Sequence, residues 1–134
     1  MHFVENPSKK RKYDFSGNSD VSEFLRIAQQ EYMWVVLLPS PYVCAEWEYG
    51  GYPYWLQNEE GLEVRSMNDK YLSLYTKYIN EVGKQISPYL VHRGGNVLMV
   101  QVENEYGSYG NDKVYLQKNK DIFKNKKKKI KNKN

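Results

Sequence analysis

Two short apolar runs stand out in the sequence, and a helical repeat precedes each of them. The runs are WVVLL at residues 34–38 and VLMVQV at residues 97–102. Apolar runs of this length are typical of parallel strands that are buried on both faces. Before each run, apolar side chains recur three and four positions apart, which predicts amphipathic helices over residues 20–33 and from residue 68 to just before Pro88.

The predicted elements alternate as helix, strand, loop, helix, strand, loop and helix, and the last helix starts after Asn111 or Asp112. Such alternation predicts an α/β fold in which right-handed crossovers join parallel strands. Glutamate, asparagine and aromatic residues concentrate in the two loops that follow the strands, whereas a plain HRGG turn leads into the second strand. In a β/α barrel the catalytic groups lie at the carboxyl ends of the strands, so this asymmetry is the one expected of a barrel.

The positive charge of the protein lies in its carboxyl-terminal tail. The 134-residue chain has a net charge of +4, yet residues 118–134 hold nine lysines and a single acid, Asp121, which leaves the rest of the chain net acidic. This Lys/Asn-rich segment has too few apolar side chains to form a core, so we expect it to be mostly disordered beyond about Phe123. The chain then divides into an amino-terminal segment at 1–12, a globular part at 13–117 and the low-complexity tail at 118–134.

Composition disfavours several classes of protein. No run of 18 apolar residues is present, so no membrane span is expected, and the amino-terminal residues lack the apolar core of a signal peptide. Either the chain is cytosolic or its true amino terminus is missing. A single cysteine, Cys44, excludes an internal disulfide and a cysteine-cluster metal site. His2 and His92 have no ligand-type spacing, so we expect no zinc.

A pair of glutamates follows the second predicted strand. Glu103 and Glu105 are two apart, so both would project to one side if the strand continued through them. Partial desolvation at a strand end favours the protonated form of a carboxyl group, which a general acid requires. Glycoside hydrolysis uses one such acid and a second carboxylate, about 5 Å away when configuration is retained. Asn104 is suited to hydrogen-bond a sugar 2-hydroxyl.

The simpler interpretation of a lone glutamate at a strand end is a solvent-exposed turn, because charged side chains are usually exposed. The loop after the first strand, however, repeats the pattern with Glu46 and Glu48 beside Trp47 and Tyr49. Carboxylates that gather in one place mark functional sites. From the residues alone, an exposed turn and an acid/base site both stay open.

Three segments resemble consecutive signatures of the glycoside hydrolase family 35 β-galactosidases. They are PSPYVCAEWEYGGYPYWL at residues 39–56, VRSMNDKYL at residues 64–72 and MVQVENEYGSYG at residues 99–110. The segment YDFSGNSDVSEFLRIAQQ, residues 13–30, is similar to the one that precedes them in that family. Order and spacing agree from residue 13 to about residue 123.

The resemblance implies a partial (β/α)8 TIM barrel, about two to three β/α units of a catalytic domain that hydrolyses terminal β-D-galactose residues with retention. It makes Glu105 the acid/base and Asn104 a substrate-binding neighbour. Ala45 and Glu46 match positions that contact the galactose hydroxyls, and Glu103 is expected inside the barrel as support. The resemblance also suggests an extracellular, lysosomal or vacuolar setting, a β-galactoside of an oligosaccharide or glycoconjugate as partner, and no cofactor.

The chain departs from the family pattern in three places. Leu38, Pro39 and Ser40 stand where family members generally carry an Arg and a Gly around the proline. The upstream strand with its sugar-contacting tyrosine is absent or blurred. The family nucleophile belongs to a later strand, whereas no Glu or Asp follows Asp121. Since double displacement needs a second carboxylate, we expect the 134-residue chain by itself to be inactive or nearly so.

Three alternatives remain beside the galactosidase. Four basic residues at 9–12 and the lysine tail could neutralise phosphates in a nucleic-acid-binding protein, although the rest of the chain is acidic. A carbohydrate-binding remnant would keep the contacts of Glu46 and Asn104 without turnover. A different retaining glycosidase of the same barrel type is the third, because an NE pair after a strand is widely shared; the pairing of CAEWE with ENEYGSYG favours the galactosidase.

Overall fold

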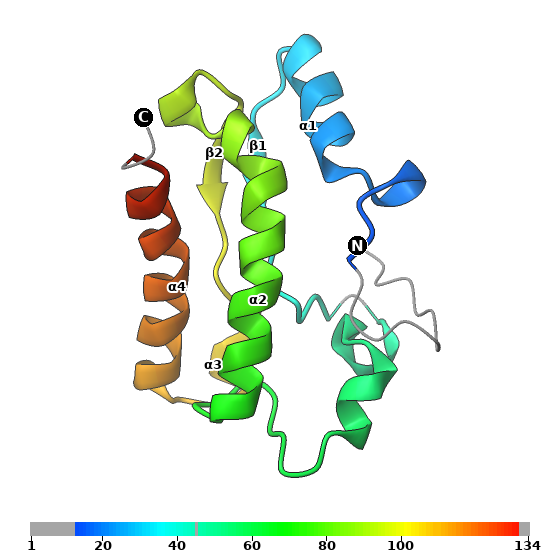
Figure 1. Ribbon diagram of the computed structural model, residues 1–134, viewed down its shortest axis with the longest axis vertical. Helices are drawn as coiled ribbons and strands as arrows, with labels where there is room; N and C mark the ends of the chain where they lie inside the picture. The colour runs from blue at the N-terminus through cyan, green and yellow to red at the C-terminus, as the bar shows by residue number, and fades with distance from the viewer. Residues whose placement is uncertain (1–12, 45, 132–134) are drawn as a thin grey trace. The chain divides into compact units, whose positions relative to one another are not determined.

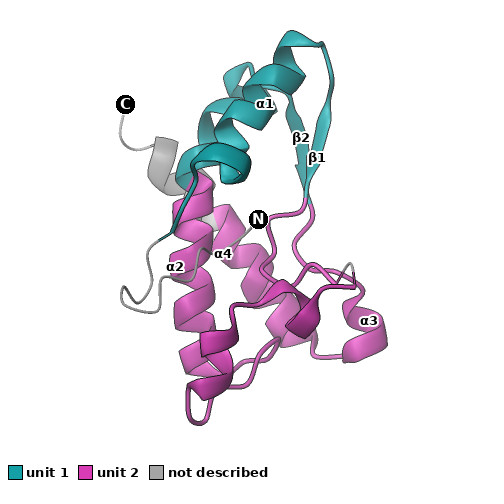
Figure 2. Ribbon diagram, turned by 90° about the vertical axis from the view of Figure 1, so that its right-hand side faces the viewer, with its two compact units in different colours: residues 1–37, 84–100 teal, residues 38–83, 101–134 magenta. Residues whose placement is uncertain are grey.

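The computed structural model describes residues 13–44 and 46–131 of the chain (Figure 1). The predicted amino-terminal segment 1–12 and the predicted substrate-binding residue Ala45 lie outside the described residues. The described residues form two compact units, drawn in different colours in Figure 2. One holds the residues up to 37 together with 84–100, and the other holds 38–83 together with the residues from 101 onward.

The first unit contains the two predicted strands, and they pair in parallel as expected. Strand β1 spans Val35–Leu37 and strand β2 spans Val97–Val100. The register places Val35 opposite Val97 and Leu37 opposite Val100, with an irregularity after Val35. The helices of this unit are η1 (Gly17–Ser19), α1 (Val21–Gln30), η4 (Ser87–Tyr89) and η5 (Val91–Arg93).

Helix α1 begins where the sequence predicts it. The Asp20 carboxylate caps the helix by accepting a hydrogen bond of 2.9 Å from the backbone N–H of Glu23. Leu25 and Ala28 of α1 are buried, whereas the apolar side chain of Phe24 on the same helix is 61% exposed. The apolar side chains of α1 are therefore only partly buried among the described residues.

A buried asparagine ties the parts of the first unit together. The side-chain amide of Asn96 donates to the backbone oxygens of Leu25 at 3.3 Å and Met33 at 3.1 Å. Its own backbone oxygen accepts from the N–H of Val35 at 2.9 Å. Asn96 therefore joins α1, the turn after it and the start of β1 to the start of β2, at a site that is only 4% exposed.

The second unit is helical and rich in buried tyrosines. Its helices are η2 (Glu48–Gly51), η3 (Tyr54–Asn58), α3 (Tyr106–Tyr109), α4 (Lys113–Lys131) and most of α2 (Asp69–Ile86). The Asn68 side chain caps α2 by accepting from the N–H of Tyr71, and Asp112 caps α4 by accepting from the N–H of Tyr115. These starts confirm the predicted positions of both helices. Six tyrosines are at most 7% exposed in this unit: Tyr52, Tyr71, Tyr75, Tyr78, Tyr106 and Tyr115.

The structure differs from the sequence prediction at two element ends. The second strand was expected to run to Val102 but ends at Val100, where the backbone leaves the sheet. The tail was expected to be disordered beyond about Phe123, yet α4 continues as helix through Lys131. Lysine is a good helix former and no Gly or Pro interrupts this segment, so local propensity favours helix even where no core can form. The proposed division at residues 117 and 118 stays a prediction.

The fold shown is thus a mixed α/β arrangement with two parallel strands in the described part of the chain. No helix of that part is both long enough and apolar enough to span a membrane. Both strands lead at their carboxyl ends into the second unit, through residues 38–68 after β1 and 101–112 after β2. These two connections carry the residues that the sequence analysis singled out.

The turn into β2 generates a prediction about stability. A Cβ added at Gly95 would lie 2.1 Å from the backbone carbon and oxygen of Tyr89, and a backbone cannot yield as a flexible side chain can. Gly95→Ala should therefore lower the free energy of unfolding by about 2 kcal/mol or more. Gly107→Ala is the control, because a Cβ there meets nothing within 4 Å, and it should leave stability unchanged or raise it by less than about 1 kcal/mol. Equal effects in urea unfolding would contradict the packing of this turn.

Candidate active site

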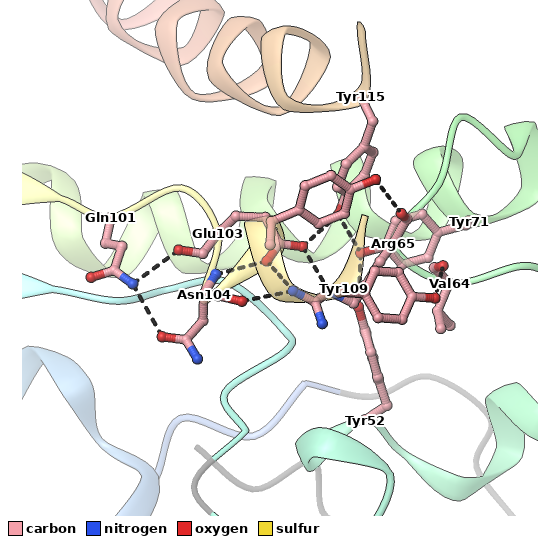
Figure 3. Close-up of polar contacts among 10 residues, drawn as sticks. Tyr52, Val64, Arg65, Tyr71, Gln101, Glu103, Asn104, Tyr109 and Tyr115 are labelled. Carbon is pink, nitrogen blue, oxygen red and sulfur yellow. Dashed lines mark hydrogen bonds and ion pairs between the residues drawn. The ribbon is translucent and has the colours of Figure 1, made fainter. Parts of the chain in front are cut away.

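A buried ion pair lies at the centre of the candidate site. The guanidinium of Arg65 donates to the Glu103 carboxylate from two nitrogens, Nη2 to Oε2 at 2.8 Å and Nε to Oε1 at 3.1 Å. The two side chains are 3% and 5% exposed. Arg65 Nη2 also donates to the backbone oxygen of Asn104 at 2.6 Å (Figure 3). One arginine therefore binds both the carboxylate and the next residue of the loop after β2.

The Glu103 carboxylate has further donors besides Arg65. The hydroxyl of Tyr115 donates to Oε1 at 2.9 Å, and the backbone N–H of Asn104 donates to Oε2 at 2.7 Å. Each oxygen thus accepts two hydrogen bonds, and a buried carboxylate needs such bonds to replace those that it would make with water. Glu103 is therefore engaged as a structural anchor. This agrees with the supporting position that the resemblance implies for it.

Glu103 and Glu105 do not share one face, contrary to the strand-based expectation. Strand geometry stops at Val100, and Glu105 adopts the left-handed conformation with φ of 49° and ψ of 33°. Glu105 is exposed and directly precedes the short helix α3. The chain therefore turns between the two glutamates and separates a buried one from an exposed one.

Aromatic rings surround the Arg65 guanidinium. Its central carbon lies 3.8 Å from the ring centroid of Tyr42, 4.3 Å from that of Tyr109 and 5.4 Å from that of Tyr106. Such rings attract a cation through the negative potential of their faces. Burial by itself disfavours the charge, but the hydrogen bonds and the negative charge of Glu103 outweigh it, and the pKa of Arg65 is raised. Arg65 is thus a permanent cation.

The position of the Tyr42 ring depends on a glycine. A Cβ added at Gly50 would lie 2.1 Å from the Tyr42 ring, and Gly50 has a φ of 62°. Its carbonyl accepts a hydrogen bond of 2.9 Å from the N–H of Val43. Only a residue without a side chain allows both the turn and the close approach of the ring that stacks on Arg65.

Three buried tyrosines form a hydrogen-bonded chain that ends on Glu103. The hydroxyl of Tyr52 lies 2.9 Å from that of Tyr71, which lies 3.2 Å from that of Tyr115. Because Tyr115 gives its only proton to Glu103, Tyr71 must donate to Tyr115 and Tyr52 to Tyr71. Burial raises the pKa of all three phenols far above the ordinary value, so each keeps the proton that this chain requires.

The predicted substrate-binding residues have different surroundings. Asn104 is half-buried, and its side-chain oxygen accepts from the Gln101 amide at 3.3 Å, while the same amide donates to the Glu103 backbone oxygen at 2.9 Å. Glu46 is exposed in the loop after β1 and adopts a φ of 58°. The structure thus joins Asn104 to the Arg65–Glu103 pair through hydrogen bonds, and Glu105 is the next residue along the chain. Among the described residues, no hydrogen bond joins Glu46 to that pair.

Left-handed backbone conformations are concentrated in the two loops that follow β1 and β2. In the described residues, positive φ occurs at six positions other than glycine, and five of them lie in the second unit: Cys44, Glu46, Tyr49, Arg65 and Glu105. Such conformations are costly for residues with a side chain, and they cluster at functional sites. In the described part of the chain, no three His, Cys, Asp or Glu side chains are grouped so that they could hold a metal ion.

Sequence reasoning missed the roles of Arg65, Tyr42 and Tyr115. Arg65 lies within a quoted motif, but no function was assigned to it. One signal was available: Arg65 is the only basic residue between residues 39 and 66, where five glutamates occur. A single arginine among many acids and tyrosines indicates an ion pair with stacked rings.

The buried ion pair predicts strong coupling between its partners. Arg65→Met would leave a buried carboxylate unpaired and should cost about 3 to 5 kcal/mol, and Glu103→Leu should cost a similar amount. The double variant removes both charges, so it should be at least about 2 kcal/mol more stable than either single variant. The control cycle uses the exposed pair of Arg26 and Glu23, whose coupling should be much weaker because water screens the two charges. Equal coupling energies in the two cycles would contradict the burial of the Arg65 pair.

The buried phenols predict a loss of stability in alkali. Burial raises the pKa of Tyr52, Tyr71, Tyr75 and Tyr115, so above about pH 10 these groups ionise more readily in the unfolded than in the folded chain. Their stabilising contribution is complete below that pH and declines above it. Urea unfolding followed between about pH 8 and 12, with phenolate absorbance recorded in parallel, checks this. Ionisation of every tyrosine near pH 10 without unfolding would be the contrary result.

Comparison with known proteins identifies the family to which the chain is similar. The model of the glycosyl hydrolases family 35 matches residues 4–134. A β-galactosidase of Xanthomonas manihotis is 45% identical over 112 residues, which is 84% of this chain and 19% of the relative. β-Galactosidase 1 of Dictyostelium discoideum is 48% identical over 99 residues, 74% of this chain and 15% of the relative.

A human β-galactosidase is 46% identical over 98 residues, 73% of this chain and 14% of the relative. The chain therefore spans less than a fifth of the length of these curated relatives. The family match covers nearly the whole chain, and it agrees with the three motifs and with the two parallel strands that precede the candidate site. This chain belongs to glycosyl hydrolases family 35.

Proposed function

We propose that this chain carries the acid/base part of a retaining β-galactosidase, with Glu105 as the group that moves the proton. The observation that carries the proposal is the division of the two glutamates after β2. Glu103 accepts hydrogen bonds from two Arg65 nitrogens, Tyr115 and a backbone amide, whereas Glu105 is exposed. In a chain of this family, the exposed member of the pair is the one available to a glycosidic oxygen.

In the proposed chemistry, Glu105 transfers protons and the neighbouring residues bind the sugar hydroxyls. The Glu105 carboxyl group gives its proton to the leaving glycosidic oxygen, and its carboxylate then takes a proton from the water that completes hydrolysis. Asn104 hydrogen-bonds the 2-hydroxyl, a contact that strengthens as the sugar becomes oxocarbenium-like. Glu46 and Ala45 contact other galactose hydroxyls. The partner is a terminal β-galactoside of an oligosaccharide or glycoconjugate.

The fold proposed for the site is part of a (β/α)8 barrel, about two to three β/α units. Parallel β1 and β2, each followed at its carboxyl end by a loop with glutamates, support it. The nucleophile is a second carboxylate that no residue after Asp121 supplies, so the 134-residue chain alone is proposed to be inactive. The family resemblance further supports an extracellular, lysosomal or vacuolar setting.

A chimeric enzyme tests the acid/base assignment. The matched segment of this chain replaces the corresponding 112 residues of the Xanthomonas manihotis β-galactosidase, which supplies the rest of the domain. The chimera should hydrolyse β-galactosides, and Glu105→Gln in it should lower kcat about 100-fold or more for substrates with a poor leaving group. Nitrophenyl galactosides should lose less, because their leaving group departs without a proton.

The control in the same chimera is Glu60→Gln, an exposed glutamate in the turn after η3, and it should leave kcat within about twofold. A Glu105 variant with full activity, or an equal loss for all leaving groups, would contradict the assignment. Binding of galactose without any turnover by the chimera would favour the carbohydrate-binding remnant instead.

A further inference from the structure

We propose that Arg65 is the positioning residue of the candidate site, which holds the backbone of the Glu105 loop through two contacts made by one guanidinium. This inference rests on the proposed function, because Arg65 positions a catalytic group only if Glu105 is the acid/base residue. Its structural content concerns the order of the loop after β2 and requires no sugar.

The first argument is the pattern of donors. Arg65 Nη2 donates both to Glu103 Oε2 at 2.8 Å and to the Asn104 backbone oxygen at 2.6 Å. The Asn104 N–H in turn donates to the same Glu103 oxygen at 2.7 Å. The two peptide groups that flank Asn104 are therefore both held, and the second of them leads directly into Glu105.

The second argument is that Glu105 itself has few contacts that hold its backbone. Glu105 has a φ of 49°, a region that L residues rarely adopt, and its side chain caps no helix. Among the described contacts, its carbonyl accepts one hydrogen bond, from the Ser108 N–H at 3.1 Å. External contacts are needed to maintain such a conformation, and Arg65 supplies the charged ones.

The third argument is that Arg65 is itself fixed. Its guanidinium carbon lies 3.8 Å from the ring centroid of Tyr42, which is in the loop after β1. The same carbon lies 4.3 Å from the ring centroid of Tyr109, which is in α3. The Tyr106 hydroxyl donates to the Arg65 backbone oxygen at 3.2 Å. Arg65 therefore joins the loop after β1 to both ends of α3, and a lysine at this position would lose the planar fork and the stacking while keeping the charge.

Amide hydrogen exchange of the full 134-residue chain tests the proposal. In Arg65→Lys, the Asn104 N–H should exchange about tenfold faster or more, together with the Ser108 and Gly110 amides that close α3, because the loop opens locally. Amides in the middle of α2 should change less than about threefold. The matched control is Arg26→Lys, which alters an exposed bidentate pair with Glu23 and should leave all these amides unchanged.

Chemical rescue separates positioning from simple loss of packing. Ethylguanidinium, added at concentrations far below those that denature the wild-type chain, should restore protection of Asn104 in Arg65→Ala, and ethylammonium should not, because only the planar fork bridges Glu103 and the Asn104 carbonyl.

Faster exchange that is equal in the Asn104 loop and α2, or a loop unaffected by Arg65→Lys, would overturn the proposal. Because these readouts contain no sugar, full activity of the Glu105→Gln chimera would reject the proposed function and leave this result standing.

Discussion

The ion pair between Arg65 and Glu103 is the constraint on which the second unit depends. Two opposite charges lie almost completely out of water, and such a pair is tolerated only when the geometry is bidentate and the remaining acceptor positions are filled. The structure meets both conditions through Tyr115 and the Asn104 N–H. The arrangement of the tyrosines and of the loop after β2 follows from meeting them.

The consequences of this pair extend to residues that touch neither charge. Because Tyr115 gives its proton to Glu103, Tyr71 donates to Tyr115 and Tyr52 to Tyr71, so a phenol on α2 and another near η2 belong to the same support. Gly50 matters because a side chain there would displace the ring that covers Arg65. Substitutions at Tyr52, Tyr71 or Gly50 should therefore all change the conformation of the loop that carries Glu105.

The repeat of apolar residues was sufficient to predict α1, α2 and both parallel strands, because these features depend on local periodicity. It could not show that Glu103 and Glu105 separate, since that depends on where β2 leaves the sheet. The partner of Glu103 was equally hidden, because Arg65 is 38 residues away in sequence. The family motifs marked the glutamates and the asparagine, but the support around them required three-dimensional contacts.

The central claim is that the two glutamates after β2 have different tasks, one in the fold and one in the chemistry. The most direct measurement is the free energy of unfolding of the 134-residue chain with Glu103→Gln and with Glu105→Gln. The account predicts that Glu103→Gln loses at least about 2 kcal/mol, because a neutral amide leaves Arg65 without its charge partner. Glu105→Gln should stay within about 0.5 kcal/mol of the parent chain, because its side chain is exposed. Equal losses, or a larger loss for Glu105→Gln, would contradict the account.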